Sequence, residues 1–482
     1  MPEATRPHRP DLWEKVLPAV RAVRAIGDAK LERGAYVRRV ELPEFSANKY
    51  GWPSVIRSQI LLDTPHPVDW SSVVSVNQDR LGSPTISAVP QLADLAAFIR
   101  MDDELAKRLT LPGIETSDLR ERWLDHDTLE LVGDIVGRSV GLGADTDAEL
   151  LAIYLERERA IFNAKLSVDV VVPILLTQFD TEHFAISKDV RIERMDEATN
   201  ASRAPHLHST VNPFLQAAAT HAVVLSGLEI ANPGPGPRSA TRGSQIDSRI
   251  ADVAFQAIEI ASSTPVGYAQ ILLRPIGWSD GWTHDLPPIE TVNTVRRYPP
   301  AFDEQGWNTA GRSIALSGLT TLPKIFENLS RALPRVELAA RRLFQSDLRV
   351  DEDDILIDAC IGIEALLGEG RDELTHRMSL RAAAALSTGS ASADPRAIYD
   401  LTKKVYAERS TVVHGGIRKK QTIRLGDQEF STPRSAWVLL RYLLLSALEA
   451  DEPWTPAGLD GRLFDSLAHD DATSSGKATQ DR

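Results

Sequence analysis

The stretch YAERSTVVHGG, Tyr406 to Gly416, decides how the C-terminal part of this sequence is interpreted. It ends a predicted helix that begins at Asp394 and Pro395, which suit the N-cap and the first helical position. Gly415 suits the left-handed position that follows many helices. The predicted helix therefore spans about 20 residues, or about 30 Å.

The apolar side of this helix contains an arginine. Ile398, Leu401 and Val405 recur at helical spacing, and Val412 continues the pattern. Arg409 occupies the intervening position. Because arginine is rarely buried without a partner, we expect a carboxylate, a cleft or a second subunit beside it.

His414 follows Arg409 by five residues, in the last turn before the glycines. On an ideal helix the two side chains diverge by about 140°, but a last turn that tightens or frays would let both reach one groove. A guanidinium binds phosphate oxygens, and an imidazole accepts or donates a proton near neutral pH. This pair suffices for metal-free cleavage of RNA, in which the 2′-hydroxyl is the nucleophile.

A structural interpretation of the same residues is also open. Arg409 would then pair with a carboxylate of the core, and His414 would be favoured by the negative end of the helix dipole. The spacing of the two residues does not separate this interpretation from the catalytic one.

Further helices are predicted around this one, at residues 334–349, 353–368, 372–387 and 432–450. Strand patterns fade after about residue 320, so we expect an all-helical domain whose boundary lies between residues 300 and 333.

YAERSTVVHGG resembles the R-x4-6-H motif of HEPN domains, and specifically of the Apea-like HEPN family. Arg409 and His414 match the motif with four intervening residues, and Ser410 matches the family's preference for a polar residue after the arginine. IGIEALLG, which contains Glu364, resembles the earlier helix of the family, and LTHRMSLRAAAALS, from Leu374, resembles the next. The resemblance covers about residues 330–450.

The resemblance implies a helical bundle that forms a homodimer around the motif helix, so that two Arg/His pairs make one composite site. Many members of the family are metal-independent endoribonucleases in antiviral defence, toxin–antitoxin systems or RNA processing, and some have lost activity. It implies Arg409 and His414 as catalytic residues, Glu364 and Ser410 as supporting residues, and neither a cofactor nor a metal.

Glu364 lies beside an apolar ridge of its predicted helix, so it needs a cationic partner. Arg409 is the preferred partner, with Arg377 and Arg381 as rivals. His376 precedes Arg377 and is expected on an exposed helix face.

A basic cluster follows the motif in the stretch IRKKQTIR, and its members are Arg418, Lys419, Lys420 and Arg424. Next to a site that cleaves phosphodiesters, these side chains would guide RNA. A solvated hairpin is the alternative, and QTIRLGDQEF is expected to form a short hairpin. Tyr406 and the single cysteine, Cys360, are expected in the core.

Composition limits the partners of the chain. It has 482 residues, 43% of them hydrophobic and 25% charged, and a net charge of −13. An acidic surface argues against sequence-specific DNA binding, so any contact with RNA must come from a local basic site. The longest apolar run is about half of what a membrane helix needs, and the first residues show no signal peptide. We therefore expect a cytoplasmic protein with no membrane partner.

The region before the helical domain combines helices and strands. Helices are predicted at residues 11–30, 90–109, 117–138 and 145–165, the last opening with a capping box at Thr146 and Glu149. Strands are predicted at 168–179, 184–194, 222–230 and 267–274, and a Pro/Gly/Ser loop at 231–245. His206 and His208 suggest a metal site as a minor alternative, although their spacing fits no zinc pattern.

The sequence thus predicts an α+β protein. Its parts are a mixed α/β region at residues 1–320 that senses a trigger or restrains the activity, an Apea-like HEPN domain at 321–452, and a largely disordered tail at 453–482. The expected function is RNA cleavage of the HEPN type in a defence or toxin role. The alternative is a non-catalytic HEPN module that dimerises and binds RNA, a nucleotide or a protein.

Overall fold

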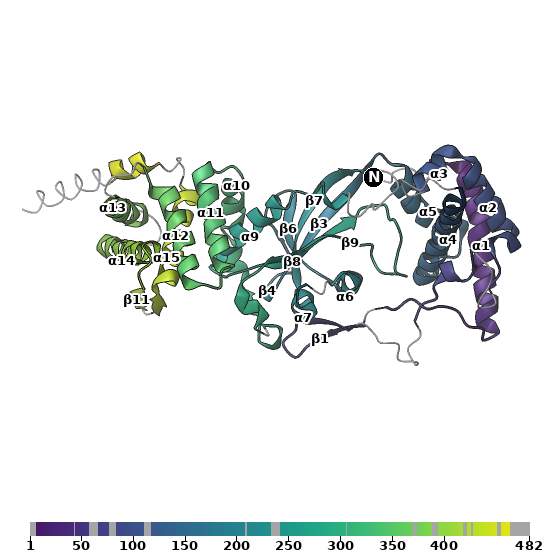
Figure 1. Cartoon of the computed structure of the whole chain (residues 1–482), viewed down its shortest axis with the longest axis horizontal. Helices are drawn as coiled ribbons and strands as arrows, with labels where there is room; N and C mark the ends of the chain where they lie inside the picture. The colour runs from purple at the N-terminus through teal and green to yellow at the C-terminus, as the bar shows by residue number, and fades with distance from the viewer. Residues whose placement is uncertain are drawn as a thin grey trace, which may run out of the picture. The chain divides into compact units, whose positions relative to one another are not determined.

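The computed structural model describes residues 6–42, 44–56, 66–76, 83–109, 117–207, 210–232, 242–304, 306–369, 374–387, 394–417, 422–425, 428–450 and 455–462. It confirms the α+β class with a helical C-terminal region (Figure 1). The chain forms two compact units. The first contains residues 1–173, 192–248 and 269–296, and the second contains 174–191, 249–268 and 297–482.

Helices of the first unit form a bundle at its start. Their bounds are α1 Pro10–Glu32, α2 Pro90–Met101, α3 Asp103–Leu109, α4 Ser117–Leu142 and α5 Asp147–Phe162. The predicted helix at 90–109 is two helices, because Asp102 has an extended ψ of 102° and its carboxylate accepts the Leu105 N–H at 2.9 Å. The capping box at Thr146 and Glu149 is confirmed.

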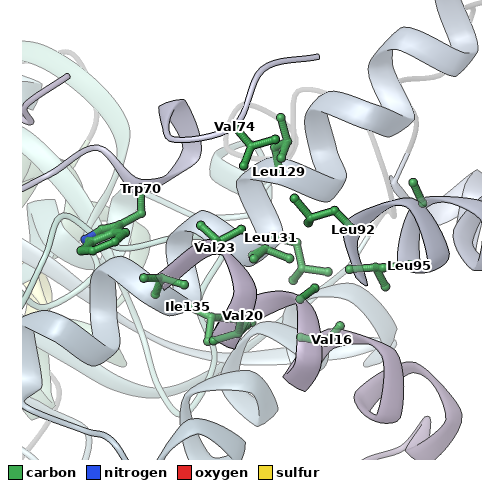
Figure 2. Close-up of a cluster of buried hydrophobic side chains, with 14 of the residues drawn as sticks. Val16, Val20, Val23, Trp70, Val74, Leu92, Leu95, Leu129, Leu131 and Ile135 are labelled. Carbon is green, nitrogen blue, oxygen red and sulfur yellow. The ribbon is translucent and has the colours of Figure 1, made fainter. Parts of the chain in front are cut away.

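The core of this bundle includes Trp70, which is buried in a short 3₁₀ turn at Trp70–Ser72. Figure 2 shows Trp70 at one edge of a cluster of apolar side chains from α1, α2 and α4, among them Val16, Val20, Val23, Leu92, Leu95, Leu129, Leu131 and Ile135. Burial of such side chains is the main favourable contribution to folding of this bundle.

A six-stranded sheet, most of which lies in the first unit, has the order β5-β6-β7-β3-β8-β9. The strands are β3 Lys165–Ile174, β5 His183–Ala185, β6 Val190–Arg194, β7 His221–Ala231, β8 Tyr268–Pro275 and β9 Glu290–Arg297. β3 and β8 are antiparallel, with Val170 opposite Leu273. The predicted strand at 168–179 is interrupted at Leu176, whose φ is 50°, and the predicted strand at 184–194 is likewise two strands.

Smaller elements complete the first unit. β1 Glu44–Ala47 and β2 Pro53–Ile56 form an antiparallel pair, and α6 Glu197–Arg203 and α7 Pro213–Ala217 are short helices. The predicted loop at 231–245 falls partly on residues 233–241, which lie outside the described residues.

The second unit is mainly helical (Figure 1, green to yellow). The five helices predicted from the sequence are confirmed as α11 Pro334–Asp347, α12 Glu352–Leu367, α13 Leu374–Ser387, α14 Pro395–Val413 and α15 Thr432–Glu449. α12 packs against α11, α14 and α15. The predicted hairpin is also confirmed, because β11 Thr422–Leu425 pairs antiparallel with β12 Gln428–Ser431.

Earlier segments of the chain belong to this unit as well. α9 Arg249–Ser262 packs against α10 Leu322–Ser330, α11 and α15. β4 Thr177–Phe179 pairs in parallel with β10 Arg312–Ile314. The sequence analysis did not predict α9, which places Glu259 inside this unit.

Part of the predicted tail at 453–482 is ordered against the helices. Residues 456–462 are helical, Leu459 is buried, and the Asp460 carboxylate accepts two hydrogen bonds of 2.7 Å from Arg381. One apolar side chain and one paired carboxylate thus attach this segment to the helices, whereas residues 463–482 lie outside the described residues. Across the described part of the chain, every helix is too short or too polar to cross a membrane.

Two glycines that face Trp70 give a matched test of the packing in the first bundle. A Cβ added at Gly27 of α1 would lie 2.3 Å from the Trp70 ring, whereas one at Gly137 of α4 would lie 3.5 Å from it. We expect Gly27→Ala to destabilise the protein by about 1–3 kcal/mol through overpacking. Gly137→Ala is expected to be neutral or stabilising by up to about 1 kcal/mol, because alanine favours the helix.

Urea unfolding of both variants and of the wild type measures this difference. Equal stability of the two variants would contradict the close approach of α1 to Trp70.

Candidate functional site

The motif residues lie at the C-terminal end of α14, which begins and ends where the sequence predicts. Asp394 is the N-cap, and its carboxylate accepts the Arg396 N–H at 3.0 Å. The helix ends at Val413, and Gly415 has a φ of 71° and donates its N–H to the Val412 carbonyl at 3.0 Å. Only a residue without a Cβ adopts this left-handed conformation at little cost, which fixes where the chain leaves the helix.

The apolar face of α14 emerges into solvent before the helix ends. Ile398, Leu401 and Val405 are buried as predicted, whereas Val413 is exposed. Arg409 lies at the point of emergence, and 31% of its side chain is exposed. Its guanidinium is therefore anchored at the edge of the core and still reaches the surface.

Glu364 of α12 is the partner of Arg409. The Arg409 Nη2 and Glu364 Oε1 atoms are 3.4 Å apart, and 26% of the Glu364 side chain is exposed. This confirms the pairing preferred from the sequence. The rival Arg381 is buried and bonds instead to Asp460 and to the Leu367 carbonyl, the latter at 2.6 Å.

The contact between Arg409 and Glu364 is an ion pair rather than a well-formed hydrogen bond, because Glu364 Oε1 has no partner of hydrogen-bond geometry in the described structure. Burial raises the pKa of Glu364, and the Arg409 charge opposes that shift. The pair is therefore held by charge and by the packing of α12 against α14.

Cys360 and Tyr406 lie in the core beside this ion pair, as the sequence predicts. Burial raises the pKa of the Cys360 thiol, and the neighbouring Glu364 carboxylate adds to the shift. The pKa of Tyr406 is also raised well above its usual value, first by burial and then by Cys360 and Glu364. Both groups are therefore neutral near pH 7, so neither supplies a thiolate or phenolate nucleophile.

His414 is the C-cap residue and its side chain is exposed. Its backbone N–H donates to the carbonyl of Ser410 at 3.1 Å, and the Ser410 side chain is exposed as well. The structure thus brings Arg409 and Glu364 into contact and places His414 and Ser410 on the exposed end of the same helix. The helix is α-helical to Val413, and the turn that follows it is closed by the hydrogen bond from Gly415 N–H to the Val412 carbonyl.

The structure describes one of the four residues of the predicted basic cluster. Arg424 on β11 is exposed, whereas Arg418, Lys419 and Lys420 lie outside the described residues. His376, which we expected on an exposed face, is exposed, and its Nδ1 lies 3.0 Å from the Tyr399 hydroxyl.

The sequence analysis missed a cavity of about 740 Å³ in the second unit. The first half of α14, the β11–β12 hairpin and α15 line it, and its charged residues are Asp394, Asp400, Lys404 and Arg424. Neither Arg409 nor His414 lines this cavity. Ser263 and Leu386 line it as well, so it arises where several separate segments meet, and no local sequence pattern predicts it.

The minor alternative of a metal site in the first unit gains no support. His206 is described and burial lowers its pKa, whereas His208 lies outside the described residues. Within the described ranges, no three His, Cys, Asp or Glu side chains are grouped as metal ligands.

Comparisons with known proteins give no further information about the candidate site. A scan against models of protein families, a search of curated proteins and a search of solved structures each gave no match.

The ion pair predicts a pH-dependent cost of removing Arg409. A carboxyl group whose pKa is raised in the fold loses stabilisation as the pH rises from its unfolded pKa through its folded pKa. Arg409→Ala removes the charge that opposes the shift of Glu364, so its cost is expected to be on the order of 1 kcal/mol at pH 7 and smaller near pH 4.

Chemical unfolding of Arg409→Ala, Glu364→Gln and the double variant between pH 4 and pH 8 measures this coupling. In the Glu364→Gln background the Arg409 substitution is expected to lose most of its pH dependence. A cost of Arg409→Ala that stays the same at every pH would contradict the electrostatic origin of the pairing.

Proposed function

We propose that this chain is a metal-independent endoribonuclease of the HEPN type, with Arg409 and His414 as its catalytic residues. The observation that carries the proposal is the end of α14. There a guanidinium held by Glu364 and an exposed imidazole lie on one helix terminus, in the motif spacing. The similarity to Apea-like HEPN domains in the sequence supports the same assignment.

Arg409 would bind the scissile phosphate. A guanidinium has five N–H donors, and the ion pair with Glu364 engages one of its terminal nitrogens. The remaining donors suit the phosphate oxygens, on which negative charge increases as the 2′-oxygen attacks. Glu364 would orient the guanidinium, and Ser410 would lie beside the bound phosphodiester.

His414 would move the proton. As a base, the imidazole takes the proton of the 2′-hydroxyl, whose oxygen then forms a bond to phosphorus. As an acid, it donates a proton to the 5′-oxygen as the bond from that oxygen to phosphorus breaks. The products are a 2′,3′-cyclic phosphate and a 5′-hydroxyl, and DNA is not cleaved because it lacks the 2′-hydroxyl.

A homodimer would supply two such histidines. Val413 and Ile417 flank His414, and both are exposed apolar residues, Ile417 to 94%. Exposed apolar side chains of this kind are typical of a surface that is covered by a partner. In this proposal the first unit senses a trigger or restrains the nuclease, and the biological role is defence or toxicity in the cytoplasm.

A non-catalytic module is the second candidate, and the ion pair itself favours it. Arg409 has a structural role in joining α14 to α12 that requires no chemistry. The helices would then dimerise and bind RNA, a nucleotide or a protein.

RNA cleavage by the purified full-length chain separates these candidates. Wild type, Arg409→Ala and His414→Ala are incubated with RNA and with DNA of the same sequence in EDTA. We expect cleavage of RNA alone, with rates reduced about 10²- to 10⁴-fold in both variants. The 3′ ends of the products are analysed for cyclic phosphate.

Two control variants remove the same residue types, an arginine and a histidine, at positions away from the candidate site. Arg396→Ala removes an exposed arginine at the start of α14, and His126→Ala removes an exposed histidine of α4. Both are expected to cleave at the wild-type rate. Folded, dimeric wild type that binds RNA without cleaving it would support the non-catalytic module instead.

A further inference from the structure

Glu259 of α9 is a buried carboxyl group in the second unit that the proposed function does not use. Its side chain is fully buried, and its neighbours Phe255 and Ile258 on α9 are buried as well. Neither carboxyl oxygen has a hydrogen-bond partner among the described residues. An ionised carboxylate in such surroundings costs several kcal/mol unless it is paired.

Charged groups of α11 and α15 lie near it, and none of the described arginines forms a hydrogen bond with it. Arg441 of α15 is nearby and donates from Nη2 to the Ala261 carbonyl at 3.1 Å. Arg434 of α15 approaches Asp347 of α11, with Nη1 and Oδ1 3.5 Å apart, and its guanidinium stacks on the Trp437 ring. Arg312 of β10 faces Asp347 and Arg434.

Asp347 also has a carboxyl oxygen that lacks a hydrogen-bond partner among the described residues. Its Oδ1 faces Arg434, whereas its Oδ2 is buried and has no hydrogen-bond partner in the described structure. Glu259 is its neighbour across the contact between α9 and α11. Two ionised carboxylates have no proton to donate to each other, so both would remain unsatisfied. A single proton between them lets one oxygen of Glu259 donate a hydrogen bond to Asp347 Oδ2.

We propose that Glu259 and Asp347 share one proton, and that this shared proton holds α9 against α11 and α15. Glu259 carries the proton and donates it to Asp347 Oδ2, while Asp347 keeps its charge next to Arg434. The pair is then a pH-sensitive latch of the second unit, which loosens as the pH rises.

The ionisation behaviour of both groups agrees with this arrangement. Burial, followed by the charge of Asp347, raises the pKa of Glu259 well above its usual value. The charge of Arg434, the neighbouring Trp437 side chain and the charge of Arg441 oppose this shift in part. Burial raises the pKa of Asp347 to about 6, against the opposing charges of Arg434 and Arg312. Because both values lie above those of the unfolded chain, the stabilisation is complete at low pH and is lost as the pH rises through the folded values.

Hydrogen exchange of α9 measures the latch directly. Amide protection of peptides covering residues 249–262 is followed by mass spectrometry between pH 5 and pH 9 in the full-length chain, after correction for the chemical exchange rate. In the wild type, protection is expected to fall as the pH rises. Glu259→Gln keeps a neutral donor facing Asp347, so its protection is expected to lose at least half of that pH dependence.

The matched control is Glu337→Gln, which neutralises an exposed carboxylate of α11 and is expected to behave as the wild type. Asp347→Asn provides a second variant, because an amide there can donate to an ionised Glu259 and should also flatten the profile. A pH profile of Glu259→Gln identical to that of Glu337→Gln would overturn the proposal.

Infrared spectroscopy detects the proton itself. In the difference spectrum between wild type and Glu259→Gln at pH 7, we expect the carbonyl band of a protonated carboxylic acid. A difference spectrum showing an ionised carboxylate instead would overturn the assignment, whatever the stability of the variants. Neither measurement depends on RNA cleavage, so the latch and the nuclease can fail separately.

Discussion

The energetic cost of burying a carboxylate shapes the helical part of this protein. α12 packs against four other helices, yet it contains Asp358 and Glu364. Asp358 is satisfied by two arginines, with Arg342 Nη1 at 2.6 Å and Arg349 Nε at 2.8 Å. Glu364 has one arginine at a longer distance. A buried charge without such partners would cost several kcal/mol, so the positions of the arginines follow from those of the carboxylates.

The same constraint explains why the candidate site lies where it does. Arg409 is held at the edge of the core because Glu364 is half-buried there, and the guanidinium is therefore both oriented and accessible. Among the described residues no comparable ion pair holds His414. It follows the last helical residue, Val413, and the left-handed Gly415 after it turns the chain away from the helix. The proposed cleavage uses an oriented cation and an exposed imidazole, and both are present near the end of α14 without any substrate.

Glu259 extends this pattern to the contact with α9. It is more deeply buried than Glu364, and none of the described arginines forms a hydrogen bond with it. In the proposed latch a proton neutralises the buried carboxylate of Glu259, whereas arginine side chains neutralise Asp358. The cation at Asp358 is permanent, whereas a proton depends on pH, so the two contacts would respond differently to the same conditions.

The sequence by itself determined the α+β class, the five C-terminal helices and the ends of α14, and it favoured Arg409 over two rival arginines as the partner of Glu364. These follow from local signals, namely caps, helical spacing and a charge out of place in an apolar pattern. Only the tertiary structure decided that α9 joins the C-terminal helices, that residues 456–462 pack on them, and that Glu259 meets Asp347. These contacts join segments far apart in the chain, and periodicity within one segment carries no information about its distant neighbours.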